Sequence, residues 1–198
     1  RAKRLNVGAF VGHSTLRLFV VGGEERPATE EEVATMCGIL REAVQAGAIG
    51  FSTSRSPSHQ GAFGRPVPSR FADVSEVATL TSVLGELGKG VVEIAAGPGL
   101  WLDQFSELSV DHGVPVTWTA LLAKAEKPGA ALRTIDRGAA LPGEVYPQMA
   151  CRPIVMQTSM ADPSPLGEID AFKEVLAVDR DKRADLYRDT AWRDRARG

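Results

Sequence analysis

The chain has 198 residues, of which 43% are hydrophobic, enough for a domain with a substantial core. Charged residues make up 24% and the net charge is −2, without a basic stripe, so the composition argues against a nucleic-acid partner. No apolar stretch approaches the ~20 residues of a membrane-spanning helix. Cys37 and Cys151 form no disulfide pattern and the N-terminus shows no leader pattern, so we expect a cytoplasmic protein.

Short apolar runs alternate with helical patterns along the chain, which is typical of βα units around a parallel sheet. After the first run, a polar turn leads to Thr29-Glu-Glu-Glu32, a pattern that predicts the capped start of a helix. In that helix apolar residues recur every three or four positions, and Gly47 ends it. We predict five parallel strands, at residues 6–11, 48–53, 91–95, 114–120 and 144–150.

Helical patterns near residues 73–87, 100–110 and 130–137 separate the later strands. The charged tail keeps apolar residues at helical intervals, which predicts two surface helices, and we divide the chain into a body at 1–166 and a tail at 167–198. The α/β pattern fits either an open doubly wound sheet or part of a (β/α)8 barrel, which has eight strands. No GxGxxG or P-loop motif follows a strand.

In either parallel architecture, functional residues gather at the carboxyl ends of the strands. His13 follows the first strand and is our candidate catalytic residue, although a histidine at a strand end more often has a structural role. The other candidates end or follow later strands, and we expect them to share one concave face with His13. These candidate substrate-binding residues are Ser52, Ser54, Arg55, His59, Gln148 and Arg152.

The charged residues near the strand ends, two arginines and one glutamate, each need a partner that balances the charge. Arg55 and Arg152 can each hold a substrate carboxylate through paired hydrogen bonds, or each can form a salt bridge at the rim. Glu93 is an acid inside an apolar strand, and it is the one residue that we consider as a metal ligand. The alternative is that Glu93 faces outward and pairs with a basic residue of a helix.

Several motifs occur together in a characteristic order. Residues 6–17 read NVGAFVGHSTLR, and RPAT at 26–29 precedes EAVQAGAIGFST at 42–53. GFSTSR at 50–55 is followed by His59 and by GRPVP at 64–68, and residues 145–153 read VYPQMACRP. With the charged tail, these segments resemble the branch of the amidohydrolase superfamily that contains D-aminoacylases and N-acyl-D-amino-acid deacylases.

The resemblance implies part of a (β/α)8 TIM-type barrel and a zinc-assisted hydrolase that cleaves a small amide. In that family an Asp after the last strand handles the proton, and an Arg pairs with the substrate carboxylate. This sequence departs from the pattern, since Ala95 occupies the position of one metal-binding His and Thr119-Ala120-Leu121 that of another. The first-strand HxH would lie before Arg1, and the catalytic Asp after Gly198.

We therefore predict the central part of a metal-dependent amidohydrolase for an N-acyl amino acid or related amide, complete only in a longer polypeptide and inactive in isolation. The alternatives are a catalytically silent binding or scaffold protein, one half of a split barrel, or an unrelated open α/β protein. Zinc is expected in the full-length protein, from the resemblance alone. An open sheet edge favours association, so we expect an oligomer or completion by additional chain segments.

Overall fold

The structure is a computed structural model that describes residues 5–61, 65–124, 127–153, 155, 157–167 and 169–197. Gly64, part of the GRPVP motif, lies outside the described residues. The chain forms two compact units, Arg1–Met149 and Ala150–Gly198, and each is described by itself. The division predicted between residues 166 and 167 falls inside the second of these units.

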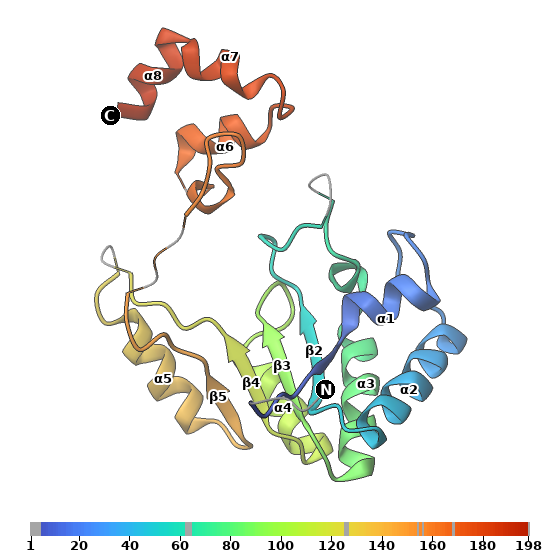
Figure 1. Ribbon diagram of the computed structural model, residues 1–198. Helices are drawn as coiled ribbons and strands as arrows, with labels where there is room; N and C mark the ends of the chain where they lie inside the picture. The colour runs from blue at the N-terminus through green and yellow to red at the C-terminus, as the bar shows by residue number, and fades with distance from the viewer. Residues whose placement is uncertain are drawn as a thin grey trace. The chain divides into compact units, whose positions relative to one another are not determined.

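The first unit contains one sheet whose five strands follow the chain order β1-β2-β3-β4-β5. All four neighbouring pairs are parallel, which confirms the predicted α/β fold class and is compatible with part of a (β/α)8 barrel. Figure 1 shows the strands side by side with helices α1 to α5 around them. The strands are β1 (Phe10–Gly12), β2 (Gly50–Ser54), β3 (Val91–Ala95), β4 (Val116–Thr119) and β5 (Val145–Pro147).

Observed strand ends differ from the predicted ones at the two edges of the sheet. The predicted strand at 6–11 becomes the three residues of β1, because only these pair with β2. The predicted strand at 144–150 shortens to β5 in the same way, since its pairing with β4 ends at Pro147. Each edge strand has one neighbour among the described residues, so fewer backbone groups are held in register there.

Helices connect the strands in the manner of βα units. One of them was not predicted: α1 begins at His13, where the sequence suggested a polar turn. The other predicted helices form close to their expected bounds. The helices of the first unit are α1 (His13–Val20), α2 (Glu30–Gln45), α3 (Val74–Leu87), α4 (Leu102–His112) and α5 (Ala130–Ala140), with a 3-10 turn η2 at Pro68–Phe71.

Local sequence signals account for the ends of these helices. Thr29 and Glu32 form the predicted capping box at the start of α2, with each side chain accepting from the other residue's backbone N–H. Gly88 and Gly113 end α3 and α4 at φ of 59° and 64°, a left-handed conformation that glycine adopts without a Cβ penalty.

The hydrophobic core lies between one face of the sheet and the helices. Alternate residues of the central strands point into it and are fully or almost fully buried: Phe51, Val92, Ile94, Val116 and Trp118. Apolar positions spaced along α2, α3 and α4 meet them, including Met36, Leu40, Leu80, Leu84 and Phe105. Because side chains alternate along a strand, the intervening residues face the opposite side of the sheet.

The second unit has a small core of its own. Its helices are α6 (Asp170–Leu176), α7 (Arg183–Arg188) and α8 (Thr190–Arg197), preceded by the 3-10 turn η3 (Ser164–Leu166), where the sequence predicted two helices. Ala171, Val175 and Trp192 are buried together, and the Trp192 indole N–H donates to the Ala171 carbonyl at 2.9 Å. Exposed charges cover the rest, as expected for helices with one apolar stripe.

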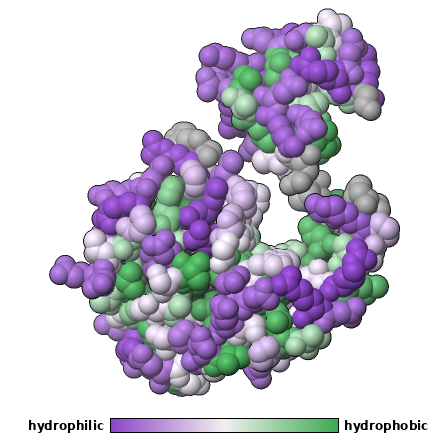
Figure 2. All heavy atoms as spheres, turned by 180° about the vertical axis from the view of Figure 1, so that it is seen from behind, coloured by the Kyte–Doolittle hydropathy of each residue, from purple (hydrophilic) through white to green (hydrophobic). Residues whose placement is uncertain are grey.

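The surface mixes hydrophilic and hydrophobic side chains, as Figure 2 shows for the side opposite to that of Figure 1. Some large apolar side chains are exposed close to the β1 edge, among them Val7, Leu18 and Phe19. Among the described residues, no helix combines the length and the apolar character that a membrane crossing requires.

Candidate functional site

The face of the sheet opposite the core is polar. Ser52 of β2, Glu93 of β3 and Thr117 of β4 lie directly beside one another in the parallel register. All three are half-buried, whereas their strand neighbours on the other face are buried. This row, which we call the open face, therefore presents hydroxyl and carboxyl groups from three adjacent strands. A few polar groups that converge from several parallel strands are what a ligand site in such a fold requires.

Glu93 lies at the centre of the open face. Gln148, just after β5, donates from Nε2 to the Thr117 hydroxyl at 3.2 Å and to Glu93 Oε1 at 3.4 Å. Burial raises the pKa of the Glu93 carboxyl above its usual value. No cation pairs with Glu93 among the residues that the structure describes. Glu93 thus faces the same side as Ala95, and the outward-facing ion pair considered above is absent from the described chain.

Ser54 and His59 meet at the carboxyl end of β2. The Ser54 hydroxyl lies 2.6 Å from His59 Nδ1. The Ser54 hydroxyl oxygen also accepts a hydrogen bond from the backbone N–H of Ser56 at 3.2 Å. The backbone carbonyl of Ser54 accepts one from the Ser69 hydroxyl at 2.9 Å. Ser69 in turn bonds Ser14 of α1 at 3.0 Å. A chain of hydroxyl contacts therefore fixes this corner of the rim.

Arg55 follows Ser54 and anchors the rim through both backbone and side chain. Its N–H donates to the Ala95 carbonyl at 3.0 Å, and its guanidinium donates from Nη1 to the Ala72 carbonyl. Gly97 approaches so closely that a Cβ there would lie 1.9 Å from the Arg55 carbonyl oxygen. A side chain at position 97 is therefore incompatible with this arrangement of the two loops.

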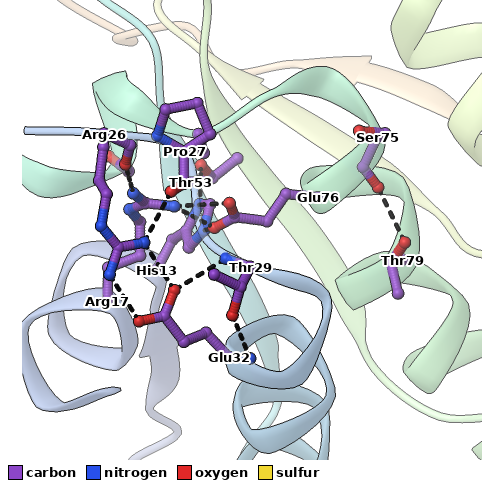
Figure 3. A network of polar contacts seen from close by, with 12 residues as sticks. His13, Arg17, Arg26, Pro27, Thr29, Glu32, Thr53, Ser75, Glu76 and Thr79 are labelled. Atoms are coloured by element: carbon purple, nitrogen blue, oxygen red, sulfur yellow. Dashed lines mark hydrogen bonds and ion pairs between the residues drawn. The ribbon is translucent and has the colours of Figure 1, made fainter. Parts of the chain in front are cut away.

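His13 lies in a buried polar network on the helix side of the sheet (Figure 3). Its Nε2 lies 2.7 Å from Glu76 Oε1 and its Nδ1 lies 2.8 Å from the Thr53 hydroxyl. A carboxylate only accepts, so Nε2 carries the proton and Nδ1 accepts from Thr53. Burial lowers the pKa of His13 and outweighs the opposing effect of the hydrogen bond that the ring donates to Glu76, which favours the neutral ring.

Glu76 of α3 joins His13 to a buried arginine. Arg17, 1% exposed, donates from Nη1 to both Glu76 oxygens at 2.6 and 2.5 Å. Burial raises the pKa of Glu76, but the hydrogen bonds from His13 and Arg17 outweigh it, and the net pKa is lowered. Arg17 Nη2 also donates to the carbonyl of Arg26. Figure 3 shows how the network continues from Arg26 to Glu32 at the start of α2.

The predicted site residues thus fall into separate groups. Ser54 contacts His59, and Gln148 contacts Glu93, both at the open face or its rim. His13 follows β1 at the same end of the sheet, yet its ring contacts Thr53, whose side chain is on the covered face. Its proposed catalytic role stays a prediction.

The remaining candidate residues are Ser52, Arg55 and Arg152, and the structure adds three polar residues that were not candidates. Arg55 lies beside Ser54 at the rim, and Ser52 lies beside Glu93. Arg152 is exposed and belongs to the second unit, so its relation to the sheet stays a prediction. The polar contacts of Arg17, Ser69 and Glu76 were not predicted from the sequence, and only Arg17 had a signal, as the last residue of the NVGAFVGHSTLR motif.

The described residues do not provide enough ligands for a metal ion. They contain no group of three or more His, Cys, Asp or Glu side chains that could hold a metal ion. Glu93 has Ser52 and Thr117 as its strand neighbours, and neither is a zinc ligand of the usual kind. The zinc that the resemblance implies therefore does not fit the described residues by themselves.

Comparison with known proteins points to deacylases. The chain is similar to a D-aminoacylase of Alcaligenes xylosoxydans xylosoxydans, with 49% identity over 49 residues. It is also similar to an N-acyl-D-aspartate deacylase of the same organism, with 51% identity over 49 residues. Each match covers 25% of this chain and only 10% of the relative's length. No family model and no solved structure matches the chain.

Proposed function

We propose that the chain forms part of an amidohydrolase that cleaves the amide bond of an N-acyl amino acid or a related small amide. The observation that carries the proposal is the similarity, at about half identity over 49 residues, to a D-aminoacylase and an N-acyl-D-aspartate deacylase. The parallel sheet with a polar open face supports it, because this architecture delivers polar groups from several strands to one site.

The described residues have distinct roles in this proposal. Glu93 and Gln148 lie where an amide group can exchange hydrogen bonds with them. Arg55 binds the substrate carboxylate, since its bond to the Ala72 carbonyl uses one of the five N–H donors of a guanidinium. The described residues do not form a three-ligand group for zinc, so the roles proposed for them do not depend on a bound metal.

The proposal predicts amine release when the full-length polypeptide, rather than the isolated 198-residue chain, is incubated with N-acetyl amino acids of either chirality. A matched substrate pair isolates the role of Arg55: an N-acetyl amino acid and the analogue that lacks its carboxylate. Arg55→Lys is expected to raise KM for the first substrate and to leave the second unchanged, because lysine lacks the paired donors. Equal effects on both substrates contradict the proposed contact.

A second candidate function is a catalytically silent relative that binds small amides or serves as a scaffold. The observation that favours it is Ala95, which stands where the resemblance expects a metal-binding histidine. Binding of N-acetyl amino acids without any amine release supports this reading against the first. Metal analysis of the purified protein provides an independent comparison, since a silent scaffold retains its fold without bound zinc.

We also propose that the sheet is extended by further strands, from another part of the polypeptide or a second copy of the chain. β1 and β5 each pair on one side only within the described residues, and exposed edge groups favour pairing. Sedimentation of the purified protein tests this. If the purified polypeptide has only these 198 residues and sediments as a compact monomer, the proposal is contradicted.

A further inference from the structure

The contact between Ser54 and His59 has the geometry of a nucleophile and its base. The Ser54 hydroxyl is 2.6 Å from His59 Nδ1, within the range of a good hydrogen bond. His59 is exposed and Ser54 is half-buried at the carboxyl end of β2. An incoming molecule can therefore reach the pair from solvent, at the end of the sheet where functional groups gather in parallel folds.

The surrounding contacts fix both partners. The Ser56 N–H donates to the Ser54 oxygen, so the Ser54 hydrogen is directed to His59 Nδ1. The His59 backbone is held from two sides: its N–H donates to the Ser56 carbonyl at 3.1 Å, and its carbonyl accepts the Val67 N–H at 3.4 Å. With Nδ1 as the acceptor, Nε2 carries the ring proton, and it makes no hydrogen bond to any residue that the structure describes.

The geometry points to Ser54 as a nucleophile that accepts an acyl group from a carboxylic ester, with His59 as its general base. The Ser54 oxygen forms a bond to the acyl carbon while its proton moves to His59 Nδ1. The bond between the acyl carbon and the alcohol oxygen then breaks, and that oxygen takes the proton from His59. The products are acyl-Ser54 and the free alcohol, and no oxidant, reductant or metal is required.

This inference goes beyond the proposed amide hydrolysis and does not rest on it. The Ser56 N–H stabilises negative charge on the Ser54 oxygen as the proton leaves. Ser58 lies in the same loop and is exposed, and its hydroxyl contacts the Ser56 hydroxyl at 2.8 Å rather than a histidine. Ser58 is therefore a matched control serine, four residues from Ser54.

The test uses a fluorophosphonate, whose phosphorus is attacked by an activated serine with loss of fluoride. The purified protein is expected to gain one phosphonyl group, mapped to Ser54 by peptide mass analysis. Ser54→Ala removes this label, whereas Ser58→Ala retains it. A label at another residue, or no label on the folded wild-type protein, overturns the inference.

The role of His59 is tested by replacement and rescue. His59→Ala is expected to slow the labelling of Ser54 by at least about 100-fold, the lower limit of a typical general-base contribution. Added imidazole is expected to restore part of the rate, because free base then takes the proton. A purely structural histidine gives no such rescue. Unchanged labelling in His59→Ala, or loss of labelling without rescue in a variant with normal thermal unfolding, contradicts the assignment of the base.

Discussion

The buried ion network predicts a large stability loss when Glu76 becomes neutral. Glu76 accepts from Arg17 through both carboxylate oxygens and from His13 through one. Arg17 and His13 are each only 1% exposed, so water cannot solvate them in place of the lost carboxylate. Removing one partner from a buried ion pair typically costs about 3–5 kcal/mol. We therefore expect Glu76→Gln to lower the free energy of unfolding by about 3–5 kcal/mol.

An exposed ion pair on the same helix provides the control. Glu86 of α3 pairs with Arg41 of α2, and their side chains are 57% and 37% exposed. Exposed pairs contribute about 0–1 kcal/mol, so Glu86→Gln is expected to change little. The two substitutions are chemically identical and differ only in burial.

Urea unfolding of the wild type and both variants measures the difference. With a slope of about 2 kcal/mol per molar urea, a loss of 3 kcal/mol moves the midpoint by about 1.5 M. If Glu76→Gln fails to fold, His13→Gln provides a milder change, because it leaves the ion pair with Arg17 intact. Equal midpoints for Glu76→Gln and Glu86→Gln would refute the reasoning.

Two further predictions concern pH and backbone geometry. Burial lowers the pKa of His13 below 6.5, so below about pH 6.5 the unfolded chain binds more protons and stability falls. Burial raises the pKa of Glu76, but the hydrogen bonds that it accepts have a larger opposite effect, and the net pKa lies below 4.5. Stability therefore falls a second time below about pH 4.5. Urea midpoints across this range are expected to decline on acidification, and a midpoint that rises below pH 6.5 contradicts the assignment. Gly50→Ala is expected to cost about 3 kcal/mol or more, because its Cβ would lie 1.9 Å from the Val91 carbonyl at a φ of +153°. Gly47→Ala, at a φ of +111° with nothing within 4 Å, is expected to cost about 1–2 kcal/mol, and equal unfolding midpoints for the two variants contradict this reading.

The fold was predictable because it depends on local patterns. Each strand is a short apolar run between helical patterns, and burial of alternate residues such as Phe51 and Ile94 matches that pattern. Strand ends were less predictable, since they depend on which neighbouring residues are available for pairing. At β1 only three residues face β2, and this depends on the position of another segment rather than on the residues themselves.

Helix α1 shows why a buried charge is hard to predict from sequence. Its residues read as a polar turn because Arg17 is charged and Ser14 and Thr15 favour turns. The helix becomes compatible with the core only because Glu76, 59 positions along the chain, neutralises Arg17. Nothing in the sequence near Arg17 indicates this partner.

The candidate site was predictable where its contacts are local. Ser54 and His59 are five residues apart and meet within one loop, so their placement follows from the strand end and the turn. The contact of Gln148 with Glu93 needed the strand order, since the two are 55 positions apart. His13 was placed at the correct end of the sheet, but its side chain lies on the covered face because Thr53 and Glu76 occupy both ring nitrogens.

The most direct test of the account is the rate of amine release from an N-acetyl amino acid by the full-length wild-type polypeptide and by its Glu93→Gln variant. Glutamine keeps the size of the side chain and one oxygen that can accept from Gln148, but it cannot take up or release a proton, so the variant tests whether Glu93 is an acid–base group of the reaction. We expect kcat/KM to fall by at least about 100-fold while the free energy of unfolding stays unchanged. Glu107→Gln, the same change at an exposed position of α4, is expected to retain full activity. An unchanged rate in Glu93→Gln, or a full-length wild-type polypeptide that releases no amine, would contradict an amidohydrolase built on the open face.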